Sequence, residues 1–331
     1  MRKTLKSTLS KLKVDLKRTK NCVKKMIEYH DKNIAVLIPC RNEETTIANV
    51  VAGFKAAVPE ARIYVYDNAS TDQTSQKASE AGAEVVYEAT PGKGHVLRRM
   101  FADIEADVYL LSDGDGTYDP SDAPLLLKTL LEGGYDMVTG ARDGVRKDAG
   151  RKGHAFGNRI FNRLYKVLFG SEFSDIFTGY RAFSKRLVKS FPAVSSGFEI
   201  EVEVSVHASQ LRLPVTEIPV SYMQRPEGSH SKLRTIPDGL NILKSMFVLL
   251  KENRPLAMFG SLALVSFFTS VFLSIPLIMT YADTGLVPRL PTAILSATLI
   301  LLSLLLIVSG LLLDSLAKAR IETKRLTYLN C

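Results

Sequence analysis

The sequence DVYLLSDGDGTYD, residues 107–119, contains an apolar run of strand length that leads directly into two aspartates, Asp113 and Asp115. One glycine separates these aspartates and another follows them, which allows the backbone to come close to a ligand. Two carboxylates one residue apart at the end of a buried strand suit one hard divalent cation, Mg²⁺ or Mn²⁺. The stretch therefore predicts a metal-dependent site at the carboxyl end of a strand.

The residues before this stretch alternate between short apolar runs and segments with the periodicity of amphipathic helices. We expect strands at 34–39, 62–66, 84–88 and 107–112, with helices between them at 44–58, 71–82 and 93–105. This alternation predicts an α/β fold with a mostly parallel sheet covered by helices. Ligands of such sheets bind beyond the carboxyl ends of the strands, so the residues that follow each strand are the candidate site residues.

Three of the expected strands are followed by acids, amides and small hydroxyls, in the segments PCRNEE (39–44), DNASTDQT (67–74) and DGDGTYD (113–119). Asp67 is placed to accept hydrogen bonds from a base or a ribose, whereas Ser70 and Asp72 are expected to cap the next helix. Lys93 lies between two glycines and opens a helix whose N-terminus also favours a phosphate.

Two long runs near the C-terminus, 256–282 and 290–313, contain no charged residue and no histidine. Each exceeds the roughly 20 residues that a helix needs to cross a ~30 Å hydrocarbon core. They predict a transmembrane hairpin, with a pair of buried core helices as the alternative. Basic residues flank both outer ends of the hairpin, which predicts an integral membrane protein with both termini and the catalytic domain on the cytoplasmic side.

The remaining segments complete the expected domain plan. Residues 1–32 carry eight of the nine net positive charges, and their apolar residues recur at helical spacing. They predict a basic amphipathic helix on an anionic membrane surface, with a solvated basic tail as an equal alternative. We expect the α/β domain at 33–232, a juxtamembrane amphipathic helix at 233–255 and a cytoplasmic tail at 314–331.

Composition excludes other classes of protein. The three cysteines are too few and too scattered for a disulfide framework or a zinc site, and they predict a reducing compartment. The basic N-terminal segment lacks interleaved aromatic residues, so we expect no nucleic-acid partner.

Taken together, these motifs resemble glycosyltransferase family 2 with a GT-A fold, and most of all its polyprenyl-phosphate glycosyltransferases, the group that includes dolichol-phosphate mannose synthase. The resemblance covers roughly residues 33–235. It is carried by IPCRNEE (38–44), YDNASTDQT (66–74), GKG (92–94), DGDG (113–116), GYR (179–181) and RPEGSHSK (225–232). It implies a Rossmann-like, mostly parallel α/β catalytic domain, and the C-terminal hairpin matches the membrane-anchored members.

The resemblance also implies roles for individual residues at the donor site. Asp67 contacts the base or the ribose, and the residues that line the nucleotide pocket are Pro39, Arg41 and Glu43. Asp113 and Asp115 hold Mg²⁺ or Mn²⁺ and the sugar-nucleotide diphosphate, with Gly114 between them. The basic residues expected near the phosphates are Lys93, Arg142, Arg225 and Lys232. Many members carry Asp-Ala-Asp followed by Leu-Gln where this chain has DGDGTY. That departure leaves open a third metal ligand and the sugar.

Acceptor chemistry adds two further candidates. A lipid phosphate is already anionic near neutral pH, so it needs cations more than a strong base, and Arg181 joins Arg225 and Lys232 as a candidate for binding it. Asp175 resembles the acid proposed as base or acceptor-orienting group in anchored members, with a turn acid or a partner of Arg181 as the alternative. The glutamates of GFEIEVEV (197–204) fit either a strand or a helix, and Glu199 is expected to face the site.

The resemblance implies inverting transfer of one sugar from a nucleotide sugar to a polyprenyl phosphate at the cytoplasmic membrane face. We expect a UDP-sugar, with glucose or N-acetylglucosamine ahead of mannose. The alternatives are a processive or glycolipid-directed transferase of the same fold and an inactive membrane scaffold. Processive enzymes usually carry a QxxRW-type motif, which this chain lacks. Self-association through small residues of the hairpin, which include Gly260, Ser270 and Gly310, is left open.

Overall fold

The computed structural model describes residues 32–143, 162–163, 165–166, 173–226 and 235–331. The expected N-terminal amphipathic helix therefore lies outside the described residues. The chain divides into two compact units, which we call the sheet unit (residues up to 148, 178–188 and 216–230) and the helical unit (149–177, 189–215 and 231–331).

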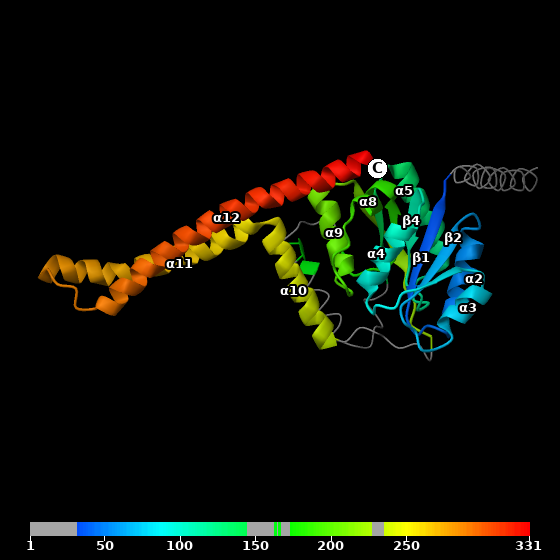
Figure 1. The fold of residues 1–331 in the computed structure, drawn as a ribbon, viewed down its shortest axis with the longest axis horizontal. Helices are drawn as coiled ribbons and strands as arrows, with labels where there is room; N and C mark the ends of the chain where they lie inside the picture. The colour runs from blue at the N-terminus through cyan, green and yellow to red at the C-terminus, as the bar shows by residue number, and fades with distance from the viewer. Residues whose placement is uncertain (1–31, 144–161, 164, 167–172, 227–234) are drawn as a thin grey trace, which may run out of the picture. The chain divides into compact units, whose positions relative to one another are not determined.

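The sheet unit contains a seven-stranded sheet with the strand order β3-β2-β1-β4-β6-β5-β7. Figure 1 labels β1, β2 and β4 of this sheet. Four neighbouring strands are parallel: β1 (Ile34–Cys40), β2 (Arg62–Asp67), β3 (Glu84–Tyr87) and β4 (Val108–Leu111). The others are β5 (Met137–Asp143), β6 (Arg181–Ser184) and β7 (Val215–Ser221), and β6 pairs antiparallel with both β4 and β5. The expected fold class, a mostly parallel Rossmann-like sheet, is confirmed.

Helices connect the parallel strands, as the periodicity predicts. They are α2 (Ile47–Ala57), α3 (Thr74–Glu80) and α4 (Lys93–Asp103). After β4 the chain continues through a 3-10 turn, η1 (Pro120–Asp122), and α5 (Ala123–Gly133), a helix outside the ranges expected from periodicity. The apolar face of α2 is completely buried against the sheet, through Ile47, Val50, Val51 and Phe54. The helices α2, α3 and α5 share one hydrophobic core with the strands, whereas the buried residues of α4 lie outside that cluster.

The helical unit contains α9 (Ile200–Leu211), α10 (Thr235–Asn253), α11 (Pro255–Thr284) and α12 (Leu290–Asn330), and α8 (Lys185–Ser190) begins in the sheet unit and ends in this one. The segment GFEIEVEV, which fits either period, thus enters a helix. Within this helix Glu203 is buried, and its carboxylate accepts hydrogen bonds from the backbone N–H groups of Val194 (3.0 Å) and Ser195 (2.8 Å).

The two C-terminal helices pack together as a hairpin, and both are long and apolar enough to cross a membrane, with mean hydropathy of 2.2 and 2.6 in their most apolar windows. Small residues line their contact. Ser270 Oγ donates to Ser296 O (2.6 Å) and Ser303 Oγ donates to Ala263 O (2.9 Å), while a Cβ added to Gly310 would lie 3.2 Å from a Phe259 side-chain atom. Ser270 and Gly310 therefore serve the hairpin itself.

The second C-terminal helix differs from the expectation beyond residue 313. The sequence predicts the end of an apolar span there, followed by a tail, but α12 continues without a break to Asn330. Residues 314–330 contain no glycine and no proline, and Asp314 pairs with Lys318 at i,i+4 spacing (2.9 Å). Hydropathy marks where a membrane span ends, whereas helix propensity decides where the helix ends.

Candidate functional site

The candidate site lies at the carboxyl edge of β1, β2 and β4. The loops after β1 and β2 are bonded to each other: the backbone N–H of Asn42 donates to Ser70 Oγ (2.8 Å) and that of Glu43 to Thr74 Oγ1 (2.8 Å). Ser70 thus anchors the neighbouring loop and does not cap α3. The N-cap of α3 is Gln73, so Asp72 is not the cap either, although it accepts the Thr74 N–H from the position before Gln73. Cys40 at the end of β1 pairs with Asp67 at the end of β2, so the two loops begin side by side.

The residues expected to line the nucleotide pocket surround these loops. Glu43 and Asp67 are buried, Pro39 is half-buried and Arg41 is exposed. Asp67 accepts hydrogen bonds from the Ser70 N–H (3.0 Å) and from the Ser75 hydroxyl, so its own loop orients the carboxylate. The structure places these four residues together at the carboxyl edge of the sheet.

A further residue at this edge, Asn68, was missed by the sequence analysis although it stands inside a quoted motif. Its side-chain amide donates to Thr90 O (2.7 Å) and its Oδ1 accepts the Gly92 N–H (2.7 Å). These bonds tie the end of β2 to the turn that carries Lys93. Asn68 is buried, and its two hydrogen bonds hold the GKG segment in position.

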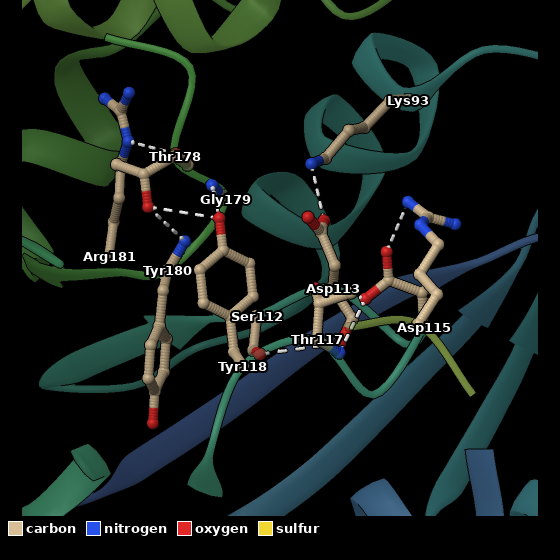
Figure 2. A network of polar contacts seen from close by, with 11 residues as sticks. Lys93, Ser112, Asp113, Asp115, Thr117, Tyr118, Thr178, Gly179, Tyr180 and Arg181 are labelled. Atoms are coloured by element: carbon tan, nitrogen blue, oxygen red, sulfur yellow. Dashed lines mark hydrogen bonds and ion pairs between the residues drawn. The ribbon is translucent and has the colours of Figure 1, made fainter. Parts of the chain in front are cut away.

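Asp113 is held from two sides. Lys93 Nζ donates to its Oδ1 at 2.6 Å, and the lysine side chain is only 9% exposed (Figure 2). On the other side the backbone of Gly179 is so close that an added Cβ would lie 2.5 Å from Asp113 Oδ2. The orientation of this carboxylate is consequently set by contacts with two segments distant in sequence.

Asp115 is held just as firmly. It is buried, its Oδ1 accepts hydrogen bonds from the backbone N–H (3.0 Å) and hydroxyl (2.6 Å) of Thr117, and its Oδ2 pairs with Arg225 at 2.5 Å. The Met223 N–H donates to Thr117 O (2.8 Å), which brings the segment bearing Arg225 alongside the loop. The structure thus joins DGDG to the start of RPEGSHSK, while Lys232 lies outside the described residues.

The pKa of the Cys40 thiol reports the carboxylates that surround this edge of the sheet. Its thiol is completely buried, and its pKa is raised by that burial first and then by four carboxylates, Glu43, Asp67, Asp113 and Asp115. The thiol is therefore neutral and is no nucleophile. Four negative charges that act on one buried atom make this edge attractive to cations.

The donor set fits a divalent cation bound together with a diphosphate. Asp113 and Asp115 supply hard oxygen ligands, and the Asp113 side chain is 27% exposed and hence accessible. Within the part of the chain that the structure describes, no cluster of three or more His, Cys, Asp or Glu side chains is arranged for a metal. A cation bound here would thus need further ligands, such as phosphate oxygens and water.

The structure gives a physical reason why residue 114, between the two aspartates, is a glycine. An added Cβ at Gly114 would overlap Cys40 Sγ and lie 3.4 Å from Ile38 Cγ2. The sulfur fills the space that the methyl group of Asp-Ala-Asp would need. Thr46 fastens the same point, since its Oγ1 donates to Gly114 O (2.7 Å).

Replacing Gly114 with alanine is expected to lower transfer activity about tenfold and stability by about 1–3 kcal/mol, because the new methyl group overpacks the core beneath the two aspartates. The double variant Gly114→Ala/Cys40→Ala should recover most of the lost activity and most of the lost stability, since alanine at position 40 leaves room for the new methyl group. Thermal unfolding and initial rates of the two single variants and the double variant measure the coupling. Gly239→Ala, where an added Cβ meets nothing within 4 Å, is the control; additive losses in the double variant would contradict the explanation.

The remaining candidate residues are placed as follows. Arg142 lies over the ring of Tyr222, with its guanidinium carbon 5.4 Å from the ring centre. Arg181 differs from the expectation: it is fully buried and its Nε donates to Thr178 O (2.9 Å), so it supports the turn before β6 and does not present its charge to a phosphate. Asp175 belongs to the helical unit, where its Oδ1 accepts the Phe177 N–H (3.3 Å).

Tyr118 and Thr178 are structural residues of the site that sequence reasoning missed. Tyr118 Oη accepts the Gly179 N–H (2.9 Å) and lies 3.2 Å from Thr178 Oγ1, which donates to Gly140 O (2.7 Å) (Figure 2). Burial raises the pKa of Tyr118, so it remains a neutral phenol. The only available signal was their position beside the DGDG and GYR motifs.

The fold and the paired aspartates define a glycosyltransferase of the GT-A type. A family model described as Glycosyl transferase family 2 matches residues 35–191. Over 244 residues the chain is 38% identical to "Glycosyltransferase AglJ" of Haloferax volcanii, an alignment that covers 73% of this chain and 80% of the relative. The chain belongs to glycosyltransferase family 2.

Two further comparisons give a more distant relative and a solved structure of similar fold. The chain is 27% identical over 229 residues to "Dolichyl-phosphate hexose transferase" of Haloferax volcanii, covering 69% of this chain and 99% of that protein. Among solved structures it resembles glucosyl-3-phosphoglycerate synthase from Mycobacterium tuberculosis in complex with Mn²⁺, UDP-glucose and phosphoglyceric acid. That match has a TM-score of 0.57 and 22% identity and covers 67% of this chain and 81% of the other; it shows the fold alone.

Proposed function

We propose that this glycosyltransferase moves a single sugar from a nucleotide sugar to a polyprenyl phosphate at the cytoplasmic membrane surface, with inversion at the anomeric carbon. The observation that carries the proposal is the pairing of Asp113 with Lys93 and of Asp115 with Arg225 at the carboxyl edge of the sheet. Such an edge suits a diphosphate and its cation. A relative that is named a dolichyl-phosphate hexose transferase supports a lipid phosphate as the acceptor.

At the donor site, Asp67 receives the base or ribose, next to the pocket of Pro39, Arg41 and Glu43. Asp113 and Asp115 would hold Mg²⁺ or Mn²⁺, which supplies charge compensation for the departing diphosphate. Lys93 and Arg225, now paired with these aspartates, are positioned to turn to the phosphate oxygens, and Arg142 adds a third cation. We propose a UDP-sugar as the donor, with glucose or N-acetylglucosamine ahead of mannose.

At the acceptor site, the lipid phosphate attacks as an anion and needs positioning more than deprotonation. We propose Arg225 and Lys232 as the cations that bind it and Asp175 as the group that orients it. Direct displacement forms the bond from the phosphate oxygen to the anomeric carbon as the bond to the nucleoside diphosphate breaks, which inverts the configuration.

The acceptor chemistry also requires access to a membrane. We propose that α11 and α12 form a transmembrane hairpin whose basic flanks, Lys251 and Arg254 before it and residues 318–325 after it, remain cytoplasmic. The exposed apolar residues along both helices then face lipid. This anchor keeps the catalytic domain at the surface where the headgroup of the acceptor lies.

The test is an incubation of the purified, detergent-solubilised full chain with Mn²⁺, a short polyprenyl phosphate and radiolabelled UDP- or GDP-sugars, scored by organic extraction. Label is expected to enter the organic phase with one UDP-sugar as a single product, and chelation by EDTA should stop it. A ladder of products would favour a processive enzyme. Folded protein that neither transfers nor hydrolyses any donor would favour the scaffold.

Replacing Arg225 with alanine is expected to raise the KM for the donor about tenfold, because one charge-assisted hydrogen bond is worth about 1.5–3 kcal/mol. The KM for polyprenyl phosphate should also rise if the same cation meets both phosphates. Steady-state kinetics with each substrate varied in turn separate the two effects. Arg62→Ala, an exposed arginine at the amino end of β2, is the control, and unchanged KM values for both substrates in Arg225→Ala would contradict the role.

A further inference from the structure

The helical unit contains a cavity of about 700 Å³ that the sugar-transfer site does not use. It is lined by α9, by α10, by the part of α12 beyond residue 313 and by the loop before α9. All of its lining residues belong to the helical unit, and none of the residues clustered around Asp113 and Asp115 lines it. The chemistry of its wall can therefore be considered by itself.

Three cations line this cavity: Lys244 from α10, and Arg320 and Lys324 from α12. Within the described residues, none of the three lies within ion-pair distance of a carboxylate. Burial lowers the pKa of Lys324, the carboxylates of Glu203 and Glu252 act in the opposite direction, and Arg320 adds to the lowering. Two of the three acids in the wall are engaged by backbone amides of the loop, Glu203 by two of them and Glu199 by that of Gly197 (3.0 Å). The third acid, Glu252, is exposed.

The deeper wall adds hydrogen-bond donors that lack acceptors. Lys324 Nζ donates to Gln210 Oε1 (3.2 Å) and Gln210 in turn donates to Asn253 Oδ1, which leaves the Asn253 side-chain nitrogen without a partner among the described residues. His207 is 2% exposed; its Nε2 lies 3.1 Å from Ser190 Oγ, and its Nδ1 has no partner in the same part of the chain.

The protonation of His207 decides what it offers to the cavity. Burial lowers the pKa of this ring to about 3, so the ring is neutral at physiological pH. The tautomer decides what Nδ1 offers: it is a donor when the Ser190 hydroxyl donates to Nε2, and an acceptor when Nε2 carries the proton. Buried donors without acceptors are costly, and a ligand oxygen removes that cost.

We propose that this cavity binds the phosphate of a membrane phospholipid headgroup. Cations and neutral donors from three helices are the groups that surround a phosphate in proteins. The lipid source is argued from the helices themselves: α10 is followed directly by α11, and Arg320 and Lys324 stand on the continuation of the apolar part of α12. A headgroup bound here joins α9, α10 and α12. The proposal uses the membrane anchor and does not rest on the sugar-transfer reaction.

The test is binding of a short-chain phosphatidylglycerol to the purified full chain in detergent, followed by native mass spectrometry and by thermal unfolding. The double variant Arg320→Gln/Lys324→Gln removes two cavity cations. Its matched control, Lys318→Gln/Arg325→Gln, removes two exposed cations from the same helix outside the cavity. The wild type and the control are expected to retain the lipid and gain thermal stability, whereas the cavity variant should bind at least about tenfold more weakly.

Two further experiments, the variant Lys244→Gln and competition with inorganic phosphate, decide between outcomes. Lys244→Gln changes an exposed side chain, so it should fold normally and still weaken binding severalfold. Equal losses in the cavity variant and in the control, or full binding by both Lys244→Gln and the cavity variant, would overturn the proposal. Inorganic phosphate that displaces the lipid at similar concentrations would overturn the lipid source in favour of a free anion. Because the readout is binding, failure of sugar transfer would not affect these results.

Discussion

Replacing Asp115 with asparagine is expected to lower transfer by roughly three orders of magnitude, since the cation that would compensate the negative charge of the departing diphosphate loses one of its two carboxylate ligands. The variant keeps one oxygen for the Thr117 N–H and hydroxyl but loses the negative charge that faces Arg225 at 2.5 Å. Mg²⁺ or Mn²⁺ would then have one carboxylate in place of two. We expect the protein to remain folded, because the amide is the same size as the carboxyl group.

The measurement is the initial rate of label transfer across a Mn²⁺ titration, together with thermal unfolding. Asp103→Asn is the matched control: Asp103 is an exposed acid paired with Arg99 at i,i+4 spacing (3.2 Å) on α4, and its change should leave the rate within about twofold because such surface pairs contribute little. Full activity of Asp115→Asn at ordinary Mn²⁺ concentration would overturn the metal assignment.

Replacing Gly179 with alanine is expected to reduce kcat/KM about a hundredfold, because displacement of a reacting constellation by about 1 Å has an effect of this size. The new Cβ would lie 2.5–2.8 Å from all three atoms of the Asp113 carboxylate group. That carboxylate must then move, and the ion pair with Lys93 at 2.6 Å moves with it. Gly179 is thus a positioning residue whose absent side chain keeps Asp113 in place.

Three readouts separate this role from a general loss of stability. The Mn²⁺ concentration for half-maximal rate should rise in Gly179→Ala, whereas thermal unfolding should change by a few degrees. Tyr118→Phe, which removes the hydroxyl that accepts the Gly179 N–H, should show a smaller effect in the same direction. Unaltered metal dependence in both variants would show that Gly179 does not position Asp113.

The parallel part of the fold was predictable because its signals are local. The strands observed as β1 to β4 and the helices between them lie within a few residues of the ranges that hydrophobic periodicity predicts. The antiparallel insertion of β6 between β4 and β5 was not predictable in this way, since strand order depends on contacts between segments far apart in the chain. The segment GFEIEVEV fits both periods in the sequence, and only the structure shows that its residues from Ile200 onward are helical.

At the site, too, the sequence predicted which residue types are present, whereas the contacts between them appear only in the structure. The aspartates, Lys93 and Arg225 were all named from motifs, but which cation meets which carboxylate appears only in the structure. Arg181 had the residue type expected of a phosphate ligand, and its burial beneath Thr178 removes it from that position. Gly179 carries no functional group, so no reading of side-chain chemistry singled it out.

The sequence by itself determined the family, the mostly parallel α/β class, the two long apolar C-terminal helices and the residues that follow each strand, because periodicity, hydropathy and motif order are properties of neighbouring residues. Only the tertiary structure decided the pairing of Lys93 with Asp113 and of Arg225 with Asp115, the contact of Gly114 with Cys40, and the cavity beside α12. These are short-range contacts between distant parts of the chain, and packing and electrostatics select them only once the sheet and the helices have come together.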